Sequence, residues 1–157
     1  MTRTLNLISA LGATLVFALI YAHGFFLGGF TTDSWNGNGY SLYGYVFSTL
    51  VVTALVTLIC MAAYGLEILL FKAVSFKHKK RAGLVFYLFI GIAVGAGLSL
   101  FYLPFDEFSY FLTTATVLTT VGSILFYLIK TFVNSAVLKK ILAFSPVVAI
   151  VLLYVLN

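Results

Sequence analysis

Five long stretches of this sequence contain no Asp, Glu, Lys or Arg. They cover residues 4–32, 34–66, 82–105, 108–129 and 141–157. A helix that crosses a bilayer needs about 20 apolar residues, because the hydrocarbon layer is about 30 Å thick and each residue adds about 1.5 Å. Each stretch reaches or approaches that length. The pattern therefore predicts an all-α integral membrane protein, a bundle of five transmembrane helices.

We expect these helices near residues 5–28, 42–71, 83–103, 108–130 and 137–156. The second stretch is longer than one span, and the turn-forming segment 34–39 places its first residues in a loop. The fifth stretch is short and contains Pro146, which removes a helix hydrogen bond. Four spans with a re-entrant or interfacial C-terminal helix are therefore the alternative. No loop is long enough to bury a core of its own, so residues 1–157 form a single polytopic membrane domain.

Composition excludes several classes of protein. The 157 residues are 62% hydrophobic and 8% charged, whereas a soluble domain carries roughly 25% charged residues. A soluble domain, a disordered chain and a nucleic-acid-binding module are therefore excluded. A disulfide scaffold is excluded as well, because Cys60 is the single cysteine.

The basic residues predict how the chain crosses the membrane. They are Arg3, Lys72, Lys77, Lys79, Lys80, Arg81, Lys130, Lys139 and Lys140. With five spans and the N-terminus inside, all nine lie on the cytoplasmic side, and Asp33, Asp106 and Glu107 lie outside. Because basic residues resist translocation, this split predicts an N-in, C-out, multi-pass protein of a cell membrane, which we take to be a bacterial inner (plasma) membrane.

Part of this positive charge is concentrated between the second and third helices. The block contains Lys77, Lys79, Lys80 and Arg81, and we expect it to contact anionic headgroups of the cytoplasmic leaflet, which attract such segments by about 1 kcal/mol per basic residue. The block determines topology on this interpretation. A lipid-specific or partner-docking site is the alternative.

Polar side chains form stripes along two of the predicted helices. At 100° per residue, each stripe falls within an arc of about 80°. The stripe on the second helix contains Thr49, Thr53, Thr57, Cys60, Tyr64 and Glu67; that on the fourth contains Ser109, Thr113, Thr116, Thr120, Ser123 and Tyr127. Such groups pack membrane helices by bonding to backbone carbonyls and across helix contacts. The alternative is a hydrated, ion-accessible seam between the two helices.

Glu67 is the most informative single residue. It precedes Lys72 by five positions, about 7.5 Å along the helix axis, and so lies near the inner edge of the membrane. It is either an interfacial carboxylate held by Tyr127 or a nearby lysine, or a group that binds a proton or a cation. Cys60 lies midway along its helix and is expected to be buried and inert.

Small residues on the third helix indicate close helix packing. Gly91 and Gly95 form a GxxxG motif, and Ser99 extends it by four residues. Such rows let two helix backbones approach each other. The contact is expected either within one chain or between chains.

The sequence does not contain the residue groupings that catalysis needs. It has no paired carboxylates within one span, no Ser–His or Ser–Lys pair at matching depth and no phosphate-binding glycine loop. No set of His, Cys and carboxylate residues has ligand spacing, so we expect no metal and no cofactor. The expectation is a non-enzymatic accessory, immunity or assembly subunit of a membrane complex, which associates with another membrane protein or with copies of itself. A homo-oligomeric pore, transporter or sensor that uses the polar seam is the alternative.

Overall fold

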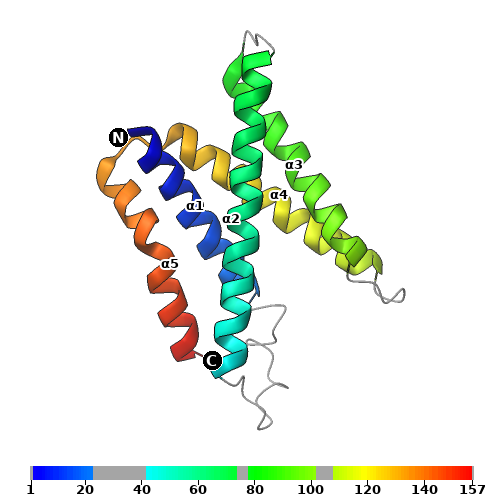
Figure 1. The fold of residues 1–157 in the computed structure, drawn as a ribbon, viewed down its shortest axis with the longest axis vertical. Helices are drawn as coiled ribbons and strands as arrows, with labels where there is room; N and C mark the ends of the chain where they lie inside the picture. Colours follow the sequence, from blue (N-terminus) through cyan, green and yellow to red (C-terminus); the bar gives the residue numbers. More distant parts are fainter. Residues whose placement is uncertain (1, 23–41, 74–77, 102–107, 157) are drawn as a thin grey trace. The chain divides into compact units, whose positions relative to one another are not determined.

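The computed structural model describes residues 2–22, 42–73, 78–101 and 108–156, and the regular structure within these ranges is helical. The five α-helices are α1 (Thr2–Tyr21), α2 (Leu42–Ala73), α3 (Lys79–Phe101), α4 (Phe108–Phe132) and α5 (Ala136–Leu156) (Figure 1). All five are long and apolar enough to cross a membrane, judged by length and composition. The prediction of an all-helical chain with five helices of spanning length is confirmed.

Several helices extend beyond the stretches that lack charge. α3 begins at Lys79 rather than near residue 83, because Lys and Arg are good helix formers and the first turn closes with a 3.0 Å bond from Ala82 N to His78 O. α2 and α4 each continue two residues past their expected ends. Some predictions lie outside the described residues: the ends of the first and third helices at residues 28 and 103, and the positions of Asp33, Lys77, Asp106 and Glu107.

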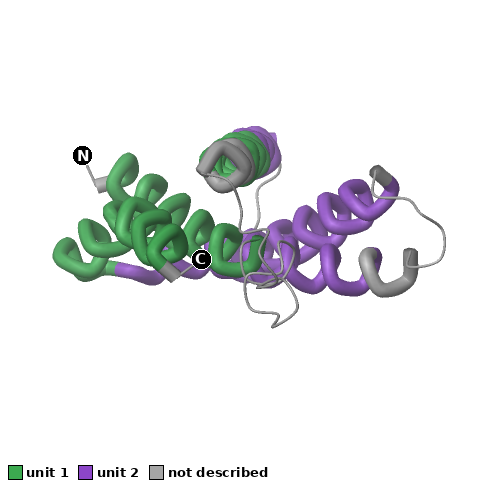
Figure 2. The backbone as a smooth tube through the Cα atoms, turned by 90° about the horizontal axis from the view of Figure 1, so that it is seen from below, with its two compact units in different colours: residues 1–59, 134–157 green, residues 60–133 purple. Residues whose placement is uncertain are grey.

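The chain divides into two compact units (Figure 2). Unit 1 comprises residues 1–59 and 134–157, and unit 2 comprises residues 60–133. The boundary falls within α2, so the first part of that helix belongs to unit 1 and the second part to unit 2.

In unit 1, α1 and α5 pack side by side and run in the same direction. A Cβ on Gly12 would overlap the Leu142 carbonyl oxygen, and farther along both helices Leu19 packs with Leu153 in a buried cluster. Residue numbers therefore rise together along the two helices. A parallel pair is what the first and fifth of five successive membrane crossings would form.

α5 passes through Pro146 without interruption. Proline has no N–H group, so the carbonyl four residues earlier, on Leu142, loses its helix hydrogen bond. The Ser145 hydroxyl donates to that carbonyl oxygen at 2.8 Å. A side chain thus satisfies the group that proline leaves open, as a helix in an apolar medium requires. This explains how a helix of 21 residues accommodates the proline.

In unit 2, α3 and α4 form an antiparallel pair. A Cβ on Gly83 would meet the Tyr127 ring, one on Gly91 would meet the backbone of Thr120, and one on Gly95 would meet the backbone of Thr116. Residue numbers rise along α3 while they fall along α4. The GxxxG motif therefore packs α3 against α4 of the same chain, where the absence of side chains lets the two backbones approach.

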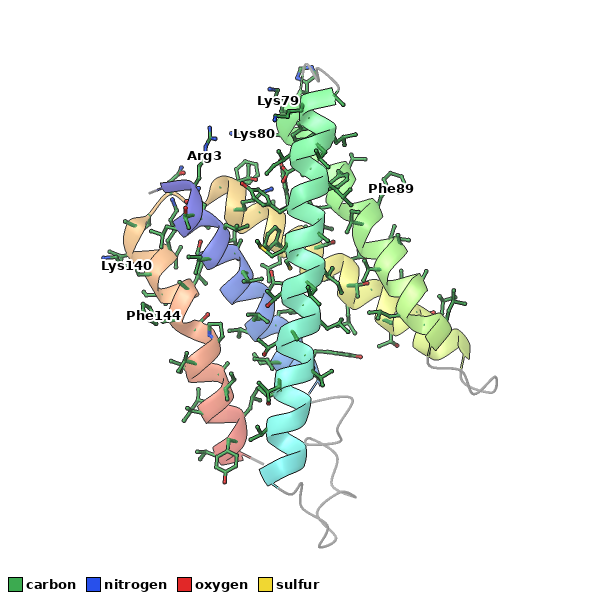
Figure 3. The ribbon with its side chains drawn as sticks, viewed as in Figure 1. Arg3, Lys79, Lys80, Phe89, Lys140 and Phe144 are labelled. Atoms are coloured by element: carbon green, nitrogen blue, oxygen red, sulfur yellow. The ribbon has the colours of Figure 1, made fainter. Side chains whose placement is uncertain are left out.

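The outward surfaces of the helices are strongly apolar. On α2, Leu58 is 71% exposed, and on α5, Val155 is 73% exposed. Phe89 of α3 and Phe144 of α5 also project from their helices (Figure 3). Extensive apolar surface of this kind is unfavourable in water and suits contact with lipid or with other membrane helices.

Candidate functional site

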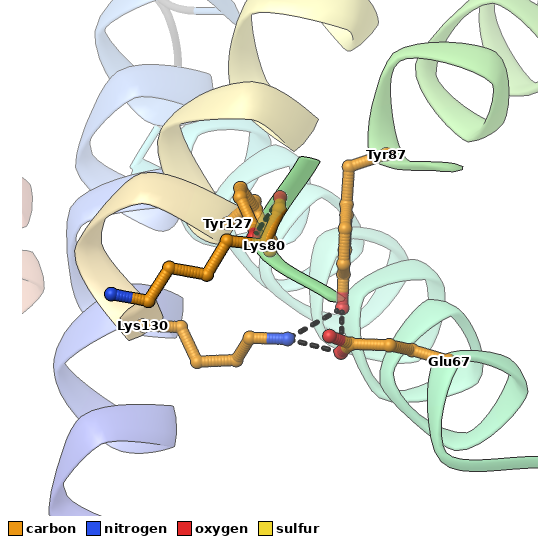
Figure 4. A network of polar contacts seen from close by, with 5 residues as sticks. All are labelled: Glu67, Lys80, Tyr87, Tyr127 and Lys130. Atoms are coloured by element: carbon orange, nitrogen blue, oxygen red, sulfur yellow. Dashed lines mark hydrogen bonds and ion pairs between the residues drawn. The ribbon is translucent and has the colours of Figure 1, made fainter. Parts of the chain in front are cut away.

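A charged network in unit 2 connects three helices. Lys130 of α4 forms an ion pair with the Glu67 carboxylate of α2. The Tyr87 hydroxyl of α3 donates to the same carboxylate oxygen, Oε2, at 3.0 Å, and Lys130 Nζ lies 3.3 Å from the Tyr87 hydroxyl oxygen (Figure 4). The side chains of Lys130 and Glu67 are only 12% and 11% exposed. The network therefore places a neutral, largely buried pair of opposite charges where α2, α3 and α4 meet in unit 2.

Aromatic rings surround the Lys130 ammonium. Its distances to the ring centroids are 4.8 Å for Tyr87, 5.2 Å for Tyr64, 5.5 Å for Tyr127 and 5.9 Å for Phe126. All four lie within the roughly 6 Å at which a ring face attracts a cation. We call Glu67 and these four rings the ammonium cage. It stabilises a positive charge that would otherwise be costly to bury.

Packing of the rings fixes the position of Tyr87. Tyr87 is 1% exposed. The centroid of its ring lies 5.7 Å from the Phe126 ring centroid and 5.4 Å from the Tyr127 ring centroid. Phe86 makes an edge contact at 5.4 Å. Because the ring is held on several sides, its hydroxyl is directed at Glu67 rather than free to rotate away.

Tyr127 connects α4 to the first turns of α3. Its hydroxyl donates to the Lys80 carbonyl oxygen, and its ring passes over Gly83, where a Cβ would lie only 2.6 Å from a ring carbon. The Lys80 ammonium points away from Glu67 and lies 5.2 Å from the Phe132 ring centroid (Figure 4). Lys130 therefore provides the ammonium in the cage, and Lys80 does not.

Several hydroxyls on α4 bond to backbone carbonyls. Ser123 donates to the Tyr87 carbonyl of α3 at 2.7 Å or to its own helix at 2.9 Å. Thr119 has the Gly91 carbonyl of α3 at 2.7 Å and carbonyls of α4 as alternative acceptors for its single proton. Thr120 donates within α4, to Thr116 O at 2.6 Å. Thr116 differs, because its buried Oγ1 has no hydrogen-bond partner among the described residues.

The two predicted stripes have different surroundings in the structure. On α4, Thr116, Thr120, Ser123 and Tyr127 lie toward α3, while Thr113 is exposed. On α2, Thr49, Cys60 and Glu67 are buried and Thr53, Thr57 and Tyr64 are half-buried. Thr49, Thr53 and Thr57 belong to unit 1 and the other three to unit 2. Within unit 2, Tyr64 and Glu67 meet α4 at Lys130.

Two other predicted groups lie at opposite parts of α3. Lys79, Lys80 and Arg81 are exposed in its first turn, which contains no acidic residue, and Figure 3 shows Lys79 and Lys80 at this end of the helix. Lys77 of the same block lies outside the described residues. Ser99, toward the other end, is 2% exposed and donates to the Gly95 carbonyl at 2.8 Å.

Sequence reasoning left Tyr87 out of the site and included Lys130 only as a topology determinant. Glu67 is held by a nearby lysine, as one of the two interpretations expected, and its tyrosine partner is Tyr87 rather than Tyr127. The sequence did contain a signal that Lys130 pairs with Glu67. Lys130 is a cation in the last turn of α4, and Glu67 is an anion near the end of α2. Two ions near matching helix ends are expected to pair.

The chemistry available here is charge pairing and hydrogen bonding. The Glu67 carboxylate accepts one bond from the Lys130 ammonium and one from the Tyr87 hydroxyl, and the rings provide an electron-rich wall. In the part of the chain that the structure describes, no three His, Cys, Asp or Glu side chains come together as metal ligands would. Comparisons with known protein families, with curated proteins and with solved structures found no match to this chain.

Proposed function

We propose that this chain is a non-enzymatic accessory subunit of a membrane complex and acts by associating with another membrane protein. The proposal includes an accessory, immunity or assembly role. Association would use the apolar outer faces of the helices, because several polar side chains of unit 2 already bond to backbone carbonyls or to one another.

The observation that supports this proposal is the bonding of the α4 stripe. Thr119 and Ser123 have α3 carbonyls within hydrogen-bond distance, and Thr120 bonds within α4. A hydrated path along α4 would have to break these bonds. Lys130 already neutralises Glu67, so a permeating cation would also compete with a built-in ammonium. These features favour helix packing over conduction.

The membrane placement completes the proposal. We place the N-terminus and the basic residues on the cytoplasmic side, in a multi-pass arrangement suited to a bacterial inner membrane. The exposed Lys79, Lys80 and Arg81 would then contact anionic headgroups. Such contacts would hold the start of α3 at the membrane surface.

An ion-flux assay tests this proposal against a pore. We expect proteoliposomes that contain the purified chain to pass potassium ions and protons no faster than protein-free liposomes. Substitution Glu67→Gln is expected to leave that background rate unchanged, because no conduction depends on the carboxylate. A flux well above background that Glu67→Gln abolishes would contradict the proposal and favour the homo-oligomeric pore.

A further inference from the structure

The ammonium cage has the composition of a ligand-binding site, although a side chain of the protein fills it. Glu67 provides the negative charge, the Tyr87 hydroxyl oxygen lies 3.3 Å from Lys130 Nζ, and four rings lie within 6 Å of that nitrogen. An ion pair alone needs only one carboxylate. The additional wall of rings resembles the aromatic cages in which proteins bind quaternary ammonium ligands.

We propose that the ammonium cage is a binding site for a primary alkylammonium group, which Lys130 occupies in this structure and from which an external ammonium displaces it. The ligand is defined by the group that Lys130 itself presents, a CH₂–NH₃⁺ terminus. This inference goes beyond the proposed function and does not depend on it.

The polar acceptors in the cage favour a primary over a quaternary ammonium. Lys130 Nζ donates to Glu67 Oε2 and to the Tyr87 hydroxyl oxygen. A group with N–H bonds can satisfy both acceptors. Tetramethylammonium has no N–H bond, so it would leave the buried carboxylate and the phenol without those hydrogen bonds, which is costly in an apolar site. The cage should therefore discriminate between the two kinds of cation.

Charge balance makes the binding an exchange rather than an addition. Glu67 and Lys130 already sum to zero, and a second cation would leave a net buried positive charge. If Lys130 leaves as the ligand enters, the site stays neutral. Lys130 lies two residues before the end of α4, and a lysine near a helix end can extend its ammonium to the membrane interface. The Lys130 ammonium can therefore be solvated at the membrane interface after it leaves the cage.

The cage is not sealed against entry. Both charged side chains keep a small exposed fraction, 12% for Lys130 and 11% for Glu67. Two kinds of molecule present the same primary ammonium group: the headgroup of an aminophospholipid and a soluble amine. Adding phosphatidylethanolamine to the binding experiment distinguishes them.

The first test removes the resident ammonium. Lys130→Ala in nanodiscs of phosphatidylcholine and phosphatidylglycerol is expected to bind radiolabelled butylammonium saturably. The wild type should bind it at least about tenfold more weakly, because its tethered lysine competes at high effective concentration. Tetramethylammonium should compete at least about tenfold less well than unlabelled butylammonium.

Two further variants control this test. Glu67→Gln added to Lys130→Ala should weaken butylammonium binding at least about tenfold, because the carboxylate is the main acceptor. Lys80→Ala removes a lysine that points away from the cage and should bind butylammonium like the wild type.

Phosphatidylethanolamine in the nanodiscs should reduce butylammonium binding if the headgroup is the source and leave it unchanged if the source is a soluble amine. An absence of saturable binding to folded Lys130→Ala, or binding that persists without Glu67, would overturn the proposal.

The wild-type protein provides a test that does not depend on the folding of any variant. With lysine labelled by carbon-13 at Cε, the Lys130 resonance should be shifted by the four surrounding rings. Titration with butylammonium should move it toward the position of exposed lysines such as Lys79, and tetramethylammonium should not. A Lys130 resonance that stays in place up to saturating butylammonium would contradict displacement.

Discussion

Replacing Lys130 with methionine is expected to destabilise the protein by about 3–5 kcal/mol, because it leaves the Glu67 carboxylate buried without its counter-ion. Methionine keeps an unbranched side chain against the four rings, so most of the loss comes from charge rather than from packing. The free energy of unfolding can be measured by titration with SDS in mixed micelles. The Lys72→Met variant is a matched control, because Lys72 is exposed on α2 and its loss should cost little.

The double variant Glu67→Gln, Lys130→Met separates an unpaired charge from a general loss of packing. Without either charge, the site needs no counter-ion, and most of the lost stability should return. If the double variant is as unstable as the sum of the two single variants, the two residues are not coupled. That result would contradict the ion pair as the link between α2 and the rest of unit 2.

Replacing Gly91 with leucine is expected to separate α3 from α4 locally and to destabilise unit 2 by about 1–3 kcal/mol or more. A Cβ at this position would lie 2.5 Å from the Thr120 Cα and 2.9 Å from the Thr119 carbonyl oxygen. These are backbone atoms, so α4 itself must move. The Thr119 and Ser123 hydroxyls would then lose their acceptors on α3. The same SDS titration measures the effect.

Gly97 provides the control on the same helix. A Cβ there would meet nothing within 4 Å, so Gly97→Leu should be tolerated. Both substitutions change helix propensity in the same way, which removes that contribution from the comparison. Equal stability of the Gly91→Leu and Gly97→Leu variants would show that the GxxxG face does not determine α3–α4 packing.

The positions of the helices were predictable from the sequence because apolar length is a local property. The stretches without charged residues located the five helices. The observed boundaries differed from the predicted ones mainly where charged residues extend a helix, as at Lys79. Pro146 made the continuity of the fifth helix uncertain, and the structure accounts for that continuity, since the Ser145 hydroxyl donates to the Leu142 carbonyl that proline leaves open. A count of apolar residues cannot reveal this compensating hydrogen bond.

The partners of the polar groups were not predictable, because they depend on which helices pack together. The sequence showed that Gly91 could sit in a close contact but not that Thr120 faces it. It showed Glu67 as a lone carboxylate, and its pairing with Lys130 joins residues 63 positions apart. Helical periodicity orients a side chain around its own axis and carries no information on the neighbouring helix. The cage therefore became visible only in three dimensions.

The native mass of the tagged protein, gently extracted from its host membrane, tests most directly whether this chain acts as a subunit. We expect one copy of the chain in a complex of defined stoichiometry with a different membrane protein. The identity of that protein would then define the role of the chain. A closed ring of identical copies with no other protein would contradict the account and favour a pore.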